Sequence, residues 1–174
     1  MVGRGGIGSV GRVRAPSEAD RAAVAALLGR EPDGVFEVVV RHPDGSPLVI
    51  RNAPVLPSGR PMPTRHWLVG EPERTWVGRL ESERGVDRAE AEIDADALAA
   101  AHRRAAAERD AAVPPDWEGH RPSGGVAGTR TGVKCLHAHY AEWLAGVDDP
   151  VGAWVADHLP DVGGTAPTIS PHHP

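Results

Sequence analysis

The sequence predicts an α+β domain, in which a small antiparallel sheet of about three strands packs with four to five helices. Strand-like segments cluster between residues 35 and 69, and helix-like segments follow them. The two kinds of segment do not alternate as they do in a parallel βαβ fold. The chain of 174 residues fits one core, which we expect over residues 16–159, with flexible segments at 1–15 and 160–174.

The N-terminal half is predicted to contain one helix followed by the sheet. Ser17 is typical of a helix N-cap, and the apolar stripe after it predicts a helix over residues 18–28. Runs rich in β-branched residues on both sides of the turn signal Pro43-Asp44-Gly45 predict a β-hairpin, and a later segment can add a third strand. One of the neighbours Arg65 and His66 is predicted to face the covered side of the sheet and to need a partner. The predicted strands cover residues 35–41, 48–51 and 64–69.

The C-terminal half is predicted to be helical. Apolar residues at helical spacing predict one helix that ends at Gly85, and an alanine-rich stretch predicts a longer helix that Asp94 or Asp96 caps. Asp149 followed by Pro150 predicts the start of the last helix. The long helix is predicted over residues 94–112, and two shorter ones over about 133–145 and 150–159. Four glutamates on either side of Gly85 are predicted to form a solvated face: Glu81, Glu83, Glu90 and Glu92.

The composition argues against several classes of protein. A formal net charge of −5 argues against general nucleic-acid binding, because affinity for a phosphate backbone comes from clustered lysine and arginine. No segment approaches the roughly 18 apolar residues that mark a membrane span. The single cysteine excludes an intrachain disulfide, and the N-terminus lacks the apolar run of a secretory signal. We therefore expect a soluble, cytoplasmic protein.

Lys134 and Cys135 mark the candidate site, because they are the only lysine and the only cysteine in the chain. They follow the glycine-rich segment 124–132, part of a predicted long loop, and they lie at a predicted helix start. Unpaired backbone N–H groups and the helix dipole favour an anion at such a position. We therefore expect the region 124–139 to bind a small anion of the phosphate type. The candidate ligand-binding residues are Lys134, Arg130 and His137, joined by His102 and Arg109 from one face of the long helix.

The same region allows three other roles. Cys135 and His139 are four residues apart on one helix face and could bind one metal ion, with zinc as the candidate. Further ligands could come from His42, His66 or His102. Cys135 could instead act as a nucleophile, because a helix start and the neighbouring Lys134 both lower a thiol pKa. The five tryptophans, otherwise expected in the core or in a pocket, could with the proline-rich loops present a surface to a protein partner. The sequence leaves open whether the protein is an enzyme.

Five motifs occur in the order found in a known family: Arg41 to Pro47, Pro61 to Leu68, Arg79-Leu80-Glu81, His102 with Arg109, and Val133 to His137. Over about residues 35–157 the chain therefore resembles the uncharacterised bacterial proteins grouped as "domain of unknown function 501". This family has no established activity, so the resemblance implies no catalytic residues. It does imply cysteines in many members at the positions of His42 and Gly70, which suggests a metal or redox site assembled there with Cys135 and His137. Glycine at position 70 cannot bind a metal through a side chain.

Overall fold

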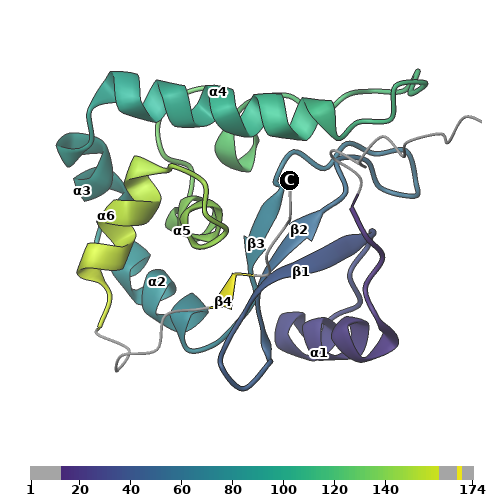
Figure 1. The fold of residues 1–174 in the computed structure, drawn as a ribbon. Coiled ribbons are helices and arrows are strands. Elements are labelled where there is room, and N and C mark those ends of the chain that lie inside the picture. Colours follow the sequence, from purple (N-terminus) through teal and green to yellow (C-terminus); the bar gives the residue numbers. More distant parts are fainter. Residues whose placement is uncertain (1–12, 161–167, 170–174) are drawn as a thin grey trace, which may run out of the picture.

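The structure is a computed structural model that describes residues 13–160 and 168–169. Within these residues, six α-helices and one antiparallel sheet form the fold (Figure 1). The strands are β1 (Phe36–Arg41), β2 (Pro47–Asn52), β3 (His66–Leu68) and β4 (Thr168–Ile169), in the order β3-β2-β1-β4. The helices are α1 (Glu18–Leu28), α2 (Glu73–Ser82), α3 (Gly85–Glu92), α4 (Ala95–Ala111), α5 (Leu136–Leu144) and α6 (Pro150–His158), with a 3₁₀ turn η1 at Val126–Gly128.

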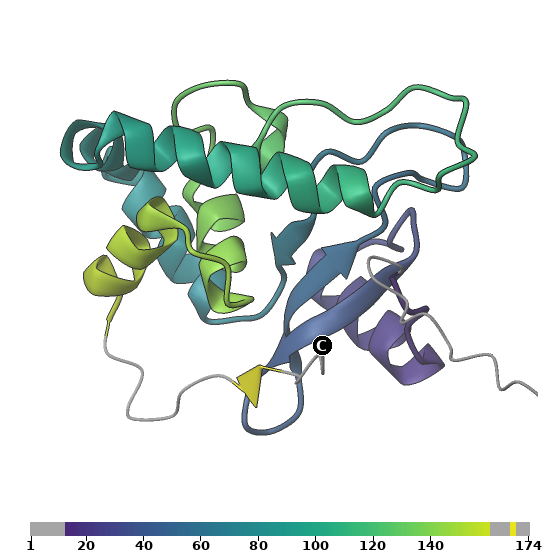
Figure 2. The ribbon, with the colours of Figure 1, turned by 45° about the horizontal axis from the view of Figure 1, so that its top comes forward.

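The sheet is covered on both faces. α1 packs against one face, where Val24 joins a buried cluster that includes Phe36 and Val38. Helices α2 and α5 cover the other face, where Leu48 and Leu136 belong to one large buried cluster, and α6 packs on α5. Figures 1 and 2 show α1 and α5 on different sides of the strands, with α4 crossing above them. This arrangement confirms the predicted α+β class.

Several predicted elements are confirmed at their ends. α1 covers the predicted residues 18–28, and Oγ of Ser17 accepts a hydrogen bond from the amide of Asp20 at 3.1 Å. Asp149 caps α6 in the same way, because its carboxylate accepts from the amide of Gly152 at 2.9 Å. The hairpin β1–β2 and the long helix α4 lie within about a residue of their predicted bounds.

The predicted terminal segments fall largely outside the described residues. Only residues 13–15 of the expected N-terminal arm are described. In the expected C-terminal segment, the two residues of β4 pair antiparallel with β1, with Ile169 opposite Val40.

Helix α3 is absent from the sequence prediction, and Gly85 explains the difference. The sequence predicts that this glycine ends a helix, whereas in the structure it is the first residue of α3. A Cβ atom at Gly85 would lie 2.5 Å from the carbonyl oxygen of Leu80, which is closer than real Cβ atoms come. The glycine is therefore required by the sharp turn between α2 and α3, and it does not prevent the chain from resuming a helix.

α5 begins at Leu136 rather than near residue 133, because two acidic side chains hold the segment before it. Oε1 of Glu90 accepts a hydrogen bond from the amide of Val133 at 2.5 Å, and Oε1 of Glu81 accepts from the amide of Leu136 at 2.6 Å. These two glutamates were expected to form a solvated face. They instead fasten the start of α5 to α2 and α3.

The tryptophans divide between the core and the surface. Trp154 is 7% exposed and belongs to the main core, but Trp143 is 39% exposed, so its predicted place in the core is wrong. The close approach of α6 to α5 explains this difference. A Cβ atom at Gly152 would lie 2.4 Å from Cβ of Trp143, so no space remains for the indole between the two helices. The indole stacks on Tyr140, with ring centroids 5.9 Å apart.

Asp149 joins α5 to α6, because one carboxylate oxygen caps α6 and the other lies 2.8 Å from Nδ1 of the fully buried His139. We expect Asp149→Ala to lower the free energy of unfolding by about 3 kcal/mol, since it removes a cap and leaves a buried imidazole without its partner. Urea unfolding measures this loss. Ser17→Ala removes only an exposed cap and is the matched control, with an expected loss of about 1 kcal/mol. Equal losses in the two variants would show that the contact with His139 contributes nothing.

Candidate functional site

A cavity of about 400 Å³ lies beside the edge strand β3 and the start of α5. Its apolar lining comes from Trp67, Leu68, Ala127 and Ala138. Its polar lining comes from Thr64, His66, Arg74, Lys134, Cys135 and His137. The cavity therefore brings together three residues that the sequence singles out, Lys134, Cys135 and His137.

Lys134 is the candidate whose charge is most available. Its side chain is exposed, and its ammonium group donates to the carbonyl oxygen of Ala127 at 3.4 Å. No carboxylate of the described residues forms an ion pair with it. Arg130 is also exposed, but it does not line the cavity.

His102 and Arg109 hold the glycine-rich loop and do not line the cavity. Both side chains are buried, at 6% and 2% exposure. Nδ1 of His102 accepts from the amide of Val126 at 3.1 Å, so Nε2 carries the proton that it shares with the carbonyl oxygen of Gly132 at 3.0 Å. Burial lowers the pKa of His102, which agrees with a neutral ring. The guanidinium of Arg109 donates to the carbonyl oxygen of Gly124 at 2.6 Å. These two residues therefore fasten the loop to α4.

His137 lies in the cavity wall and, when its ring is protonated, forms an ion pair with Glu81. Burial alone would lower the pKa of His137, but the hydrogen bond and the charge of Glu81 outweigh burial and raise it. Nδ1 lies 3.2 Å from the Glu81 carboxylate, and Nε2 lies 3.1 Å from the carbonyl oxygen of Arg74. Because both neighbours are acceptors, the geometry suits an imidazolium that donates from both nitrogens. Its charge is balanced by Glu81.

Cys135 is placed as an N-cap residue, half-buried at the start of α5. Burial raises the pKa of its thiol, and the charge of Glu81 adds to this rise, although Lys134 opposes it. The thiol is therefore protonated at neutral pH. This environment disfavours the nucleophile role, which needs a thiolate.

The residues predicted as metal ligands lie in separate contacts. Nδ1 of His139 faces Asp149, and Nε2 of His42 lies 3.4 Å from Oε2 of Glu73. Among the described residues, no group of three or more histidine, cysteine, aspartate or glutamate side chains is arranged to hold a metal ion.

Positions 42 and 70, where the family resemblance implies cysteines in other members, are neighbours in space. A Cβ atom at Gly70 would lie 2.9 Å from Nε2 of His42. Glycine at position 70 therefore leaves space that the His42 ring occupies here.

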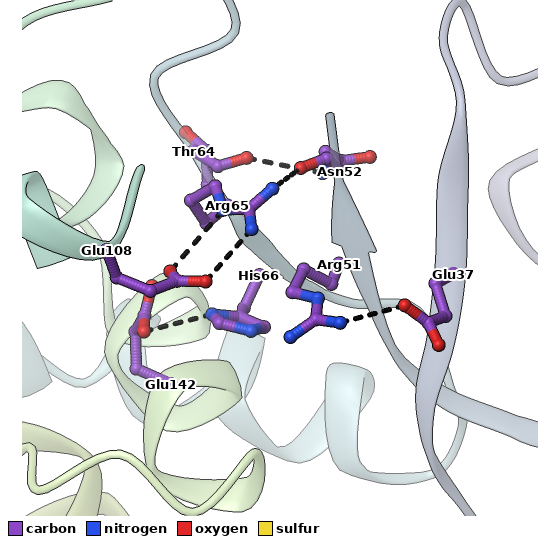
Figure 3. Close-up of polar contacts among 8 residues, drawn as sticks. All are labelled: Glu37, Arg51, Asn52, Thr64, Arg65, His66, Glu108 and Glu142. Carbon is purple, nitrogen blue, oxygen red and sulfur yellow. Dashed lines mark hydrogen bonds and ion pairs between the residues drawn. The ribbon is translucent and has the colours of Figure 1, made fainter. Parts of the chain in front are cut away.

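His66 lines the cavity, and the structure gives it a buried partner that the sequence pattern does not identify. Nδ1 of His66 on β3 lies 2.9 Å from Oε2 of Glu142 on α5, and each side chain is only 4% exposed (Figure 3). The neighbouring Arg65 is also buried and donates to the Glu108 carboxylate of α4 at 2.9 and 3.4 Å. Both residues thus have acidic partners, although only one of them was expected to face the covered side of the sheet. Glu142 is the one acidic residue of α5, a helix that is otherwise mostly apolar, and this is the signal that could have revealed the pair.

The pH dependence of stability should report the contact between Arg65 and Glu108. Burial alone would raise the pKa of Glu108, but the hydrogen bonds of Arg65 outweigh it, and the charges of Arg65, His66 and Arg51 lower the pKa further, below its ordinary value of 4.5. A carboxylate with a lowered pKa stabilises the fold above its unfolded pKa, and this contribution is lost as the pH falls through the folded pKa. We therefore expect the Glu108→Gln variant to lose less unfolding free energy than the wild-type protein as the pH falls below about 4.5.

Urea unfolding between about pH 7 and pH 3 measures this effect. Glu118→Gln, which changes an exposed glutamate on the loop after α4, is the matched control and should keep the wild-type pH dependence. An unchanged slope in Glu108→Gln would contradict a role for this carboxylate in acid sensitivity.

Comparison with known proteins agrees with the sequence motifs. No curated protein and no solved structure matches the chain. No described helix has the length and apolar character that a membrane span needs. Residues 38–157 match the family described as protein of unknown function (DUF501). The match includes Arg65, His66, helices α2 to α5 and all but the last residue of α6. The chain therefore belongs to the DUF501 family.

Proposed function

We propose that the cavity beside β3 binds a small organic anion. The observation that carries this proposal is the position of Lys134, whose ammonium group adjoins a largely apolar cavity without a carboxylate partner among the described residues. The other cations of the cavity already have partners. Arg74 donates to Glu71 at 2.8 Å, and His137 faces Glu81. One uncompensated positive charge suits a ligand with one negative charge.

The lining favours an organic ligand over inorganic phosphate. Cavities that hold small molecules have volumes of roughly 300 to 1,000 Å³ and are mostly apolar, with a few polar groups that fix orientation. The cavity of about 400 Å³ fits this description, because Trp67, Leu68, Ala127 and Ala138 supply apolar surface around Lys134. The apolar part of the ligand would contact these side chains, and its acidic group would face the lysine.

The proposal rests on Lys134 more than on the glycine-rich loop. Several amides that could cradle a phosphate already donate to protein acceptors. Gly125 donates to the carbonyl oxygen of Thr129 at 2.7 Å, and the amide of Val126 donates to His102. At the helix start, the amide of Leu136 donates to Glu81. Charge from a side chain, rather than a nest of free backbone N–H groups, is therefore the feature that would attract the anion.

The only cysteine of the chain provides a direct test, because Cys135 lines the same cavity. We expect phenylacetate to slow the alkylation of Cys135 by iodoacetamide, since a bound ligand would cover the thiol. Lys134→Met should raise the phenylacetate concentration needed for half-maximal protection about tenfold, because a charge-assisted contact is lost. The rate of alkylation is measured by mass spectrometry of the intact protein.

Two further variants serve as controls. Arg103→Met removes one positive charge from the exposed face of α4 and should leave the protection unchanged. Arg130→Met should also leave it unchanged, because Arg130 does not line the cavity. The proposal fails if phenylacetate gives no protection, or if Lys134→Met is protected as well as the wild-type protein.

A further inference from the structure

The edge of β3 that β2 leaves open borders the cavity. β3 lies at one end of the strand order, so β2 alone pairs with it among the described residues (Figure 1). His66, Trp67 and Leu68 all line the cavity. Leu68 packs in the cluster beneath α5, and Trp67 packs in the cluster of α1 on the opposite face. A cavity that contacts three consecutive residues, whose side chains alternate between the two faces, therefore lies along the edge of the strand.

The register of the sheet shows which backbone groups point toward this edge. The amide of Asn52 on β2 donates to the carbonyl oxygen of Arg65 at 2.7 Å, and the pairing from there to Leu68 is regular. Hydrogen-bonded and non-hydrogen-bonded pairs alternate along an antiparallel ladder. Trp67 therefore bonds to β2, whereas the N–H and C=O groups of His66 and Leu68 point away from β2.

The protein supplies no partner for these backbone groups. In the described part of the chain, no backbone hydrogen bond of a turn or loop ends at His66 or Leu68. Lys134 and His137, which line the same cavity, donate to other carbonyl oxygens. His66 and Leu68 are nonetheless buried, at 4% and 6% exposure. Buried backbone groups are nearly always hydrogen-bonded, so this edge marks a position where a ligand can bind.

The open edge determines the chemistry of the ligand. An N–H group needs an acceptor and a C=O group needs a donor. An amide supplies both, whereas a carboxylate supplies acceptors alone. Each residue of a strand rises about 3.4 Å, so His66 and Leu68 are about 7 Å apart along the edge, and a short extended peptide can pair with both. Because both residues are buried, the edge is reached through the cavity and suits the end of a chain rather than a strand that passes along it.

We propose that the cavity binds the C-terminal end of a peptide chain, which pairs with the edge of β3 and places its terminal carboxylate at Lys134. This inference rests on the proposed function, because it names the class of organic anion that the cavity takes. The last side chain of the peptide contacts the apolar lining, which includes Trp67 and Ala138. Peptides commonly bind by adding to a free sheet edge, where main-chain hydrogen bonds supply affinity and pockets for side chains supply specificity.

N-acetyl-L-phenylalanine and 3-phenylpropionate provide a matched pair of probes, because they differ only by one acetamido group. We expect the wild-type protein to bind N-acetyl-L-phenylalanine about tenfold more tightly, which is the effect of two net hydrogen bonds. N-acetyl-D-phenylalanine should bind no more tightly than 3-phenylpropionate, because its side chain and its amide cannot both take the positions that the L enantiomer gives them. Calorimetry and protection of Cys135 from alkylation give the three affinities.

These probes separate the inference from the proposed function. Equal affinities of the two enantiomers, or of the L enantiomer and 3-phenylpropionate, would overturn the inference and leave the binding of a small organic anion standing. Binding of none of the three acids would remove both.

N-acetyl-L-phenylalaninamide tests the position of the terminal carboxylate, because it lacks the negative charge of the acid. We expect the wild-type protein to bind this amide about tenfold less tightly than the acid, and Lys134→Met to bind the two probes equally. Arg103→Met removes a positive charge outside the cavity and should keep the tenfold difference. An amide that binds the wild-type protein as tightly as the acid would overturn the assignment of a chain end.

Nuclear magnetic resonance of the wild-type protein tests the contact with the strand without any substitution. We expect N-acetyl-L-phenylalanine to shift the amide proton of His66 or of Leu68 downfield, because a new hydrogen bond forms there, and 3-phenylpropionate to shift it less. Trp67 is the internal control, since its amide already bonds to β2. Unchanged amide signals of both His66 and Leu68 in the bound protein would overturn the pairing with β3.

Discussion

Two buried contacts between basic and acidic side chains fix the short strand β3 in place. β3 has only three residues and forms one edge of the sheet, so its ladder of hydrogen bonds with β2 is short. Arg65, just before the strand, binds Glu108 of α4, and His66 faces Glu142 of α5. Buried polar and charged groups are costly unless they have partners, so these contacts specify where α4 and α5 lie relative to the sheet. The cavity depends on this arrangement, because its walls belong to β3 and the start of α5.

Local patterns predict the elements whose signals lie within a few residues of one another. Ser17 caps α1 through an amide three residues away, and Asp149 caps α6 over the same separation. The start of α5 has a different cause, because Glu81 is 55 residues from the amide that it holds. Local periodicity in the sequence carries no information about a contact between residues so far apart. Helix α3 is missed for a related reason, since the need for glycine at position 85 arises from a contact with the preceding helix and not from helix termination.

The candidate site shows the same division between local and long-range information. The rarity of lysine and cysteine and the predicted helix start single out Lys134, Cys135 and His137, which the structure gathers at one cavity. The helical spacing also places His102 and Arg109 on one face of α4, but this face binds the carbonyl groups of the loop. Helical spacing identifies which side chains point to the same face of a helix. It does not show whether those side chains bind a ligand or another part of the protein. The partner of His66 escapes notice because Glu142 lies 76 positions further along the chain.

The pairing of His66 with Glu142 has a consequence for how the family can evolve. Either residue alone would be a buried polar group without its partner, so a single substitution at position 66 or 142 passes through a destabilised protein. The two positions should therefore vary together, either as a basic and acidic pair or as two apolar residues. Members that have lost the pair would be expected to retain the packing of β3 on α5 through apolar side chains. Covariation at these two positions would thus show which members join the strand to the helix by a polar contact and which by apolar packing.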